Sequence, residues 1–127
     1  MYNSLIVALG AAFGGVFRYW MSGAVQKVLP SSFPYGTLSV NIAGSFILGF
    51  VLFFLDSREL ISPGIKLFLT IGFCGGFTTF SAFSFETINL LRDSEFLYAF
   101  MNISSNLFLS LCAIIIAYYL SGFFTRG

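Results

Sequence analysis

The middle of the chain contains the stretch Gly72-Phe73-Cys74-Gly75-Gly76-Phe77-Thr78-Thr79-Phe80-Ser81. Adjacent glycines followed by two β-branched threonines form α-helix poorly. The stretch lies in a long apolar segment, roughly midway between Pro63 and Arg92. At the centre of a bilayer, a broken helix is tolerated only where its backbone is buried in protein or lines a water-filled cavity. We therefore predict a helix broken at this depth, with freed carbonyls that serve an ion. The alternative is a glycine-rich crossing between packed helices.

The composition of the whole chain indicates an integral membrane protein. Of 127 residues, 57% are hydrophobic, 20% are aromatic and only 9% are charged, and the mean hydropathy is +0.92. A soluble domain carries about 25% charged residues, so this chain lacks the charge to cover its surface in water. The same numbers exclude a disordered or collagen-like chain.

Charged residues and Pro/Gly breaks divide the chain into four apolar segments, residues 4–28, 34–55, 64–91 and 96–124. Each is long enough to cross a hydrocarbon core, which takes about 20 helical residues. Helices are expected because lipid forces backbone groups to be satisfied within the segment, and barrel-like alternation is absent. The predicted fold is an all-α integral membrane protein, a single domain of residues 1–127 with four transmembrane helices and the third broken near the bilayer centre.

Small residues recur four positions apart along the predicted spans. Examples are Gly10 with Gly14, Gly72 with Gly76, and Ser45 with Gly49. Such pairs let helix backbones approach closely, so they predict a packed bundle.

The loops carry almost no charge bias. Four crossings place both termini and the second loop on one side, which would hold Arg58, Lys66 and Arg126, against Lys27 and Arg92 on the other. A difference of one basic residue barely sets an orientation under the positive-inside rule. The chain can therefore insert either way round and form an antiparallel dual-topology dimer. A single topology set by weak signals is the alternative.

The residue inventory argues against an enzyme. The chain has no His, which is the commonest metal ligand and general base. Cys74 and Cys112 both lie in apolar stretches and suggest neither a disulfide framework nor a metal cluster. A net charge of +1 without a basic tail predicts no nucleic-acid partner.

Two charged residues lie inside the predicted spans away from their ends. Arg18 lies well within the first span, and an arginine at the bilayer centre costs at least ~2.5 kcal/mol. The other basic residues lie near the ends of the spans or in the loops, so an inward-facing Arg18 favours an anion over a cation as cargo. Glu86 follows the Gly72–Ser81 stretch and is expected to pair with Arg18 or with a loop lysine or arginine.

Neutral polar residues share helix faces. Thr37 and Asn41 are four apart in the second span, and Asn102, Asn106 and Ser110 repeat every four residues in the last. A polar stripe in lipid must face a partner helix or a pore, and both interpretations stay open for any single residue.

Phe80 and Phe83 share one face of the helix that follows the predicted break. A phenylalanine in a membrane is most often a packing residue. An aromatic ring nevertheless has a positive edge. Ring edges beside amide and hydroxyl donors would suit a small dehydrated anion.

Together these residues resemble the Fluc (CrcB) family of small fluoride channels over essentially the whole chain. The matching stretches are Gly14-Gly15-Val16-Phe17-Arg18-Tyr19, Pro34-Tyr35-Gly36-Thr37-Leu38-Ser39-Val40-Asn41, and Gly72-Phe73-Cys74-Gly75-Gly76-Phe77-Thr78-Thr79-Phe80-Ser81-Ala82-Phe83-Ser84. The third, with its pattern GG-x-TTFS-x-FS and a following Glu86, is the most specific.

The resemblance implies a fluoride-selective passive channel that exports cytoplasmic fluoride and lowers its toxicity. It also implies a multi-pass protein of the bacterial inner (plasma) membrane, working as an antiparallel dual-topology homodimer with two pores along the subunit interfaces. Its partners would be fluoride, the lipid bilayer and a second copy of the chain.

The same resemblance implies roles for individual residues. Asn41 would donate its amide to fluoride, while Phe80 and Phe83 present ring edges. Further fluoride-pathway donors would be Thr37, Ser81, Asn102, Asn106 and Ser110. The backbone carbonyls of Gly75 and Thr78 would hold a structural Na⁺ at the dimer centre, and Arg18 and Glu86 would have electrostatic or structural roles.

Two other classes of protein fit parts of the sequence. A small multidrug-resistance-type four-helix exporter is equally short, but it needs a carboxylate in its first helix, where this chain has Arg18. A non-transporting membrane scaffold would explain the small-residue pairs, but not the predicted break with its polar stripe.

Overall fold

The computed structural model describes residues 1–126, and Gly127, the last residue of the expected domain, lies outside them. Four helical spans are long and apolar enough to cross a membrane: Tyr2–Val28, Tyr35–Asp56, Pro63–Arg92 and Phe96–Phe124. The shortest has 22 residues, which extends about 33 Å at 1.5 Å per residue, against a hydrocarbon thickness of about 30 Å. Residues 1–126 contain no strand. The expected all-helical fold with four membrane-spanning helices is confirmed.

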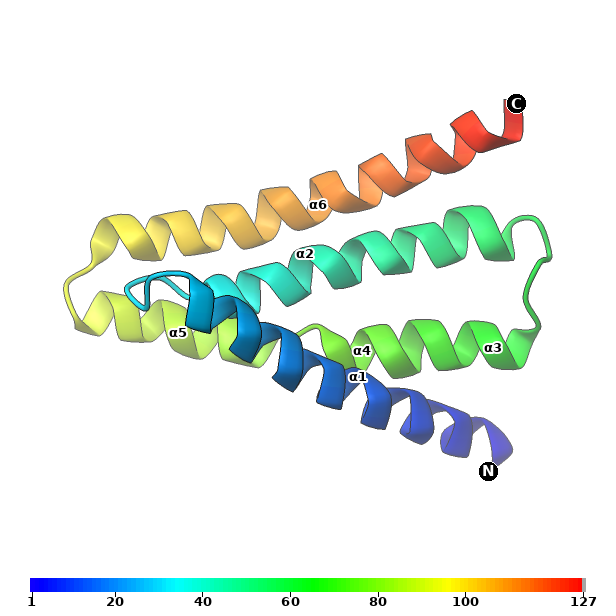
Figure 1. Cartoon of the computed structure of the whole chain (residues 1–127), viewed down its shortest axis with the longest axis horizontal. Helices are drawn as coiled ribbons and strands as arrows, with labels where there is room; N and C mark the ends of the chain where they lie inside the picture. The colour runs from blue at the N-terminus through cyan, green and yellow to red at the C-terminus, as the bar shows by residue number, and fades with distance from the viewer. Residues whose placement is uncertain (127) are drawn as a thin grey trace.

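The spans differ in how regular they are (Figure 1). The first is the single helix α1 (Tyr2–Val28), and the fourth is α6 (Phe96–Arg126). The second begins as α2 (Tyr35–Phe50) and ends in a wider π-helical segment, η1 (Val51–Asp56). The third consists, in order, of α3 (Pro63–Leu67), the π-helical η2 (Phe68–Cys74), α4 (Gly75–Phe77) and α5 (Phe80–Arg92).

Both ends of the described chain lie at the same end of the molecule, together with the loop between the second and third spans (Figure 1). The other two loops lie at the opposite end. This is the arrangement that four crossings dictate. It groups Arg58 and Lys66 at one end of the molecule and Lys27 and Arg92 at the other.

Helix α1 contacts the third span backbone to backbone. A Cβ atom added at Gly14 would overlap the Phe73 carbonyl oxygen, and one added at Gly76 would lie 2.6 Å from the Ala11 carbonyl oxygen. A Cβ at Gly72 would lie 2.9 Å from Gly10 Cα. These glycines therefore bring the two helices closer than any side chain would permit, as the spacing of small residues predicts.

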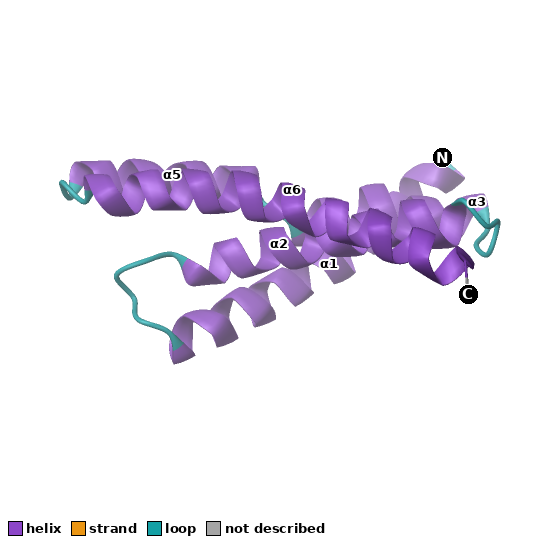
Figure 2. Cartoon of the chain, turned by 90° about the horizontal axis from the view of Figure 1, so that it is seen from above, coloured by secondary structure: helices purple, strands orange, loops and turns teal. Residues whose placement is uncertain are grey.

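The second and fourth spans form the other main packing pair, in which α2 lies against α6. Figure 2 shows α5 beside α6, and α1 beside α2, at the end of the molecule that carries the loop between α1 and α2. Many large apolar side chains point outward, and Phe13, Trp20 and Phe108 are each more than half exposed. That distribution suits a molecule whose solvent is lipid rather than water.

The side chain of Gln26 organises the loop that leads into α2. Its Nε2 donates to the carbonyl oxygens of Pro30 (3.2 Å) and Phe33 (3.1 Å), and its Oε1 accepts from the Gly36 N–H (3.1 Å). Phe33 is buried in this loop and packs edge-on against Tyr98 of α6. The loop therefore fixes where α2 begins, and with it the positions of the polar residues on α2.

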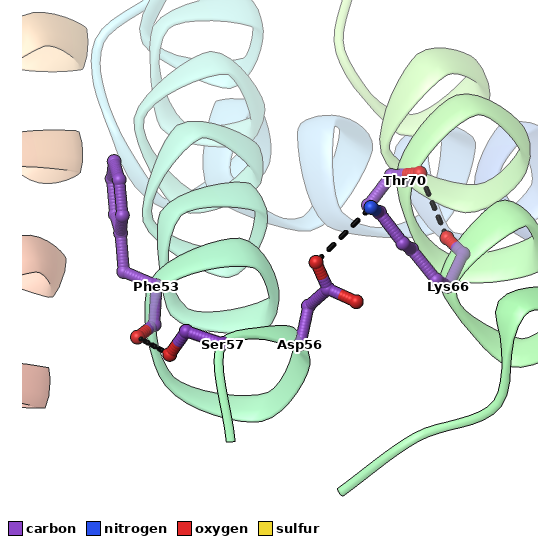
Figure 3. Close-up of polar contacts among 5 residues, drawn as sticks. All are labelled: Phe53, Asp56, Ser57, Lys66 and Thr70. Carbon is purple, nitrogen blue, oxygen red and sulfur yellow. Dashed lines mark hydrogen bonds and ion pairs between the residues drawn. The ribbon is translucent and has the colours of Figure 1, made fainter. Parts of the chain in front are cut away.

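At the opposite end, an ion pair joins the second and third spans (Figure 3). Lys66 Nζ lies 3.0 Å from Asp56 Oδ2, and the Thr70 hydroxyl donates to the Lys66 carbonyl at 2.7 Å. Ser62 caps α3 by accepting from the Ile65 N–H at 3.2 Å, ahead of Pro63 in the first turn. Both charged side chains are partly exposed, and such a pair contributes about 0–1 kcal/mol. Its main effect is to fix the short connection.

We expect Gly14→Ala to destabilise the protein because its methyl group would overlap the Phe73 carbonyl oxygen. Overpacking of this kind costs about 1–3 kcal/mol. Thermal unfolding of the purified protein in detergent measures the effect as a lower midpoint.

The neighbouring substitution Gly15→Ala is the matched control. No atom lies within 4 Å of a Cβ placed at Gly15, and alanine favours helix over glycine by about 1 kcal/mol. Its midpoint should be unchanged or higher. Equal losses in the two variants would contradict the close approach of α1 and the third span at Gly14.

Candidate functional site

The α-helical backbone of the third span is interrupted between Phe77 and Phe80. Thr78 (φ −88°, ψ 159°) and Thr79 (φ −149°, ψ 122°) are both extended. Each threonine caps one side of the interruption. The Thr78 N–H and hydroxyl donate to the Cys74 carbonyl at 3.0 and 2.8 Å, and the Thr79 hydroxyl oxygen accepts from the Ala82 N–H at 3.1 Å. The interruption falls inside the glycine- and threonine-rich stretch Gly72–Ser81.

Asn41 of α2 bonds to both backbone groups of Thr79. Its Oδ1 accepts from the Thr79 N–H at 2.8 Å, and its Nδ2 donates to the Thr79 carbonyl oxygen at 3.1 Å. A backbone donor or acceptor left unpaired in an apolar environment costs several kcal/mol. The Asn41 amide therefore replaces the helical partners that Thr79 has lost.

The interruption also redirects the donors that would normally bond to two carbonyls. In a continuous α-helix, the N–H of residue i bonds to the carbonyl of residue i−4. The N–H expected at the Gly75 carbonyl, that of Thr79, donates to Asn41, and the N–H expected at the Thr78 carbonyl, that of Ala82, donates to Thr79 Oγ1. Gly75 and Thr78 are the two residues whose carbonyls were assigned to Na⁺. Backbone carbonyls are suitable ligands for an alkali cation, so these residues fit the expected ion.

Arg18 reaches the same region from the α1 side. Its Nε donates to the Gly76 carbonyl oxygen at 3.2 Å. A guanidinium at the C-terminal end of a helix interacts favourably with the partial negative charge of the last carbonyls. Arg18 is thus positioned at the end of α4, next to the interruption.

A chain of side-chain hydrogen bonds runs from Asn41 into α6 and on to α5. Asn41 Nδ2 donates to Asn106 Oδ1 at 2.8 Å, and Asn106 Nδ2 donates to both the carbonyl oxygen and Oδ1 of Asn102 at 2.9 Å. Asn102 Nδ2 donates to Thr87 Oγ1 at 2.9 Å, and the Thr87 hydroxyl donates to the Phe83 carbonyl at 2.8 Å. The polar stripe of α6 therefore contacts two other helices, α2 and α5.

Glu86 has a different partner from those considered in the sequence. Its Oε1 accepts from the Thr37 hydroxyl at 2.6 Å, and its Oε2 is buried with no hydrogen-bond partner among the described residues. Arg18 lies instead at Gly76. The structure thus pairs Glu86 with Thr37 of α2 rather than with a basic side chain.

One groove of about 930 Å³ collects most of the candidate residues. Of the ten residues assigned to fluoride or Na⁺, seven line it: Asn41, Gly75, Thr78, Phe80, Phe83, Asn106 and Ser110. They come from α2, α4, α5, α6 and the interruption, so the groove exists only in the folded chain.

The other three assigned residues lie outside the groove lining. Asn102 is fully buried behind it, Thr37 is buried against Glu86, and Ser81 is an exposed residue whose hydroxyl lies 3.3 Å from that of Thr79. The structure therefore separates the polar stripe of α6 into wall residues and a residue behind the wall.

Phe80, which is exposed, and Phe83, which is half-buried, form a pair at the end of the groove that α5 contributes. Their ring centroids are 5.4 Å apart with planes at 58°, and Phe80 is 78% exposed. A ring that packs inside the bundle would be covered. The exposure of Phe80 leaves its ring free to meet something outside this chain.

The sequence interpretation missed three residues of this region. Ser45 lines the groove but was treated only as a small packing residue. The available signal was its spacing, because Ser45 follows Asn41 by four as Ser110 follows Asn106. Thr79 and Thr87 were missed because their importance depends on which side chains lie across from them.

Comparisons with known proteins identify relatives over nearly the full chain. Residues 5–118 match the family model described as CrcB-like protein, Camphor Resistance (CrcB). A protein of Geobacter sp. (strain M21) is 48% identical over 103 residues, covering 81% of this chain and 83% of the relative. A Flavobacterium psychrophilum protein is 44% identical over 113 residues, covering 89% and 91%.

A third relative, from Dehalococcoides mccartyi (strain CBDB1), is 43% identical over 120 residues, covering 94% of this chain and 92% of its own length. All three relatives carry the name fluoride-specific ion channel FluC. With four membrane-spanning helices and this extent of similarity, the chain is a multi-pass membrane protein and belongs to the CrcB family.

Proposed function

We propose that this chain forms a fluoride-selective channel that lets fluoride leave the cytoplasm down its electrochemical gradient. The relatives that match most of the chain carry the name of such a channel. The observation that carries the proposal is the groove, because it gathers amide, hydroxyl and ring-edge groups around the interruption of the third span. The protein is not proposed to catalyse a reaction, and its location is the bacterial inner membrane.

Fluoride is small and strongly hydrated, so a pathway must replace its water with other donors while no single site holds it too tightly. In this proposal Asn41, Ser110 and the edges of the Phe80 and Phe83 rings meet the ion in turn. Their neutral character is suitable, since a fixed cation beside the path would trap the anion. Thr37 and Ser81 stay predicted contributors that lie outside the groove lining.

Asn41 can serve an anion even though its amide protons are already used. Its bond to Asn106 joins two neutral groups, and such a bond contributes about 1 kcal/mol net. A hydrogen bond to an ionised acceptor is roughly twice as strong. Fluoride in the groove can therefore compete for the Asn41 proton that points toward Asn106 while the bond to the Thr79 backbone persists.

The second part of the proposal is an antiparallel dual-topology homodimer. The groove, with exposed Phe80 beside it, is open on this chain and needs a cover to become a closed ion path. A second copy inserted the opposite way supplies that cover, and the nearly balanced basic residues at the two ends favour insertion in both directions. In the dimer the two interruptions would meet near the bilayer centre.

A structural Na⁺ at the dimer centre completes the proposal. The carbonyl oxygens of Gly75 and Thr78 would hold it, because the N–H groups that would otherwise bond to them donate to side chains. The ion would supply positive charge to carbonyl oxygens that two oppositely directed helices bring together. Arg18 provides charge to the neighbouring Gly76 carbonyl from within the same chain.

Ion efflux from liposomes containing the purified protein tests the channel. Fluoride is expected to leave far faster than chloride, because the pathway is built for a small anion that accepts strong hydrogen bonds. Ion-selective electrodes record both anions from the same preparation. Well-folded protein that releases no fluoride, or releases chloride equally fast, would overturn the proposed function.

Replacing Phe80 or Phe83 by Ile should lower fluoride efflux about fivefold or more, which corresponds to losing an aromatic contact worth about 1 kcal/mol. The control is Phe85→Ile, a ring on the same helix that is 67% exposed and does not line the groove. Its efflux should match the wild type. Wild-type rates in both Phe80→Ile and Phe83→Ile would remove the rings from the pathway.

Purification with a bulky organic cation in place of Na⁺ tests the metal site. Loss of the ion should shift the protein from dimer to monomer in size-exclusion chromatography, and efflux should fall in liposomes made without Na⁺. Returning Na⁺ should restore both. A dimer and a fluoride flux that are indifferent to Na⁺ would rule out the carbonyl site while leaving the channel itself intact.

A further inference from the structure

The hydrogen-bond chain from Thr79 to Phe83 has only one possible direction. The Thr79 N–H can only donate and its carbonyl can only accept, so Asn41 must turn Oδ1 to the first and Nδ2 to the second. The remaining Asn41 proton goes to Asn106, which must accept it with Oδ1. The backbone at the interruption thus fixes how both amides are oriented.

The same logic passes through α6 to α5. Because Asn106 accepts with its oxygen, its two amide protons are left for the carbonyl oxygen and Oδ1 of Asn102. Asn102 accepts with Oδ1 and so donates to Thr87, whose hydroxyl proton goes to the Phe83 carbonyl. Every amide proton of Asn106 is therefore donated to Asn102.

Burial separates these residues by role. Asn102 is 0% exposed and Thr87 is 7% exposed, and neither lines the groove. Asn106 lines the groove but is itself 8% exposed. Most of this set is therefore withdrawn from the groove, and its hydrogen bonds join one member to the next.

We propose that Asn106, Asn102 and Thr87 are positioning residues that hold Asn41, the amide proposed to meet the transported ion, against the Thr79 backbone. The identity of that ion rests on the proposed function, whereas the positioning role does not. The chain of hydrogen bonds ties the interruption to α2, α6 and α5, so that Thr79 and Phe83 belong to one hydrogen-bonded unit. Asn41 is then the one amide in the unit that lies between the backbone at the interruption and the groove.

Thr87→Val tests this role without touching the groove. Valine has nearly the shape of threonine but lacks the hydroxyl that accepts from Asn102, so the far end of the chain is released. Hydrogen–deuterium exchange of the peptide containing Thr79 should accelerate about fivefold or more, the change expected for one lost buried hydrogen bond. Fluoride efflux should fall in parallel, while exchange of peptides from α1 should stay at the wild-type rate.

Two matched variants separate positioning from general loss of stability. Thr87→Ser keeps the hydroxyl and should restore both the exchange rate and the efflux. Ser84→Ala removes another α5 hydroxyl, one that donates to the Phe80 carbonyl and takes no part in the hydrogen bonds from Thr79 to Phe83. This variant should leave exchange at Thr79 unchanged. If Thr87→Val does not fold, Thr87→Cys takes its place, since a thiol is a weak hydrogen-bonding group and should give a smaller acceleration in the same direction.

The outcomes distinguish this inference from the function on which it draws. Faster exchange at Thr79 in Thr87→Val, reversed in Thr87→Ser, supports the positioning role. Wild-type exchange at Thr79 in Thr87→Val overturns it, even if efflux changes. A wild-type protein that conducts no fluoride would contradict the proposed function. The exchange comparison would still decide whether the chain of hydrogen bonds holds Asn41 against the Thr79 backbone.

Discussion

The structure depends on the pairing of the Asn41 amide with the backbone of Thr79. An interrupted helix leaves N–H and C=O groups without partners, and in an apolar environment each costs several kcal/mol. Asn41 satisfies one donor and one acceptor at once, at 2.8 and 3.1 Å. With this pairing, Thr78 and Thr79 can remain extended, and the Gly75 carbonyl loses the Thr79 N–H that it would bind in a continuous helix.

The interruption is held from two sides by different kinds of force. On one side, α1 approaches through Gly10, Gly14 and Gly76 until backbone meets backbone, which brings Arg18 within 3.2 Å of the Gly76 carbonyl. On the other side, α2, α6 and α5 are joined by directional hydrogen bonds between neutral side chains. Backbone contact at the glycines sets the distance between α1 and the third span. The hydrogen bonds between neutral side chains set how those side chains are oriented at the interruption.

The groove beside the interruption has an unusual chemistry for a site that would handle an anion. No Lys or Arg lines it among the described residues. Arg18 donates instead to a carbonyl at the end of α4. A family of fluoride channels is a consistent context, because weak neutral donors let a strongly hydrated ion exchange from one position to the next.

The sequence alone predicted the four spans, their order and a stretch of low helix propensity, Gly72–Ser81. These depend on local properties, namely the length of apolar runs and the poor helix propensity of adjacent Gly and Thr residues. It also determined the family, through motifs spread over the chain. The tertiary structure alone decided which proton goes to which acceptor: Glu86 takes the Thr37 hydroxyl rather than Arg18, Asn102 lies behind the groove, and Thr79 and Thr87 join its polar residues. The reason is that a hydrogen bond is set by distances between atoms on different helices, and residue types along one helix do not encode those distances.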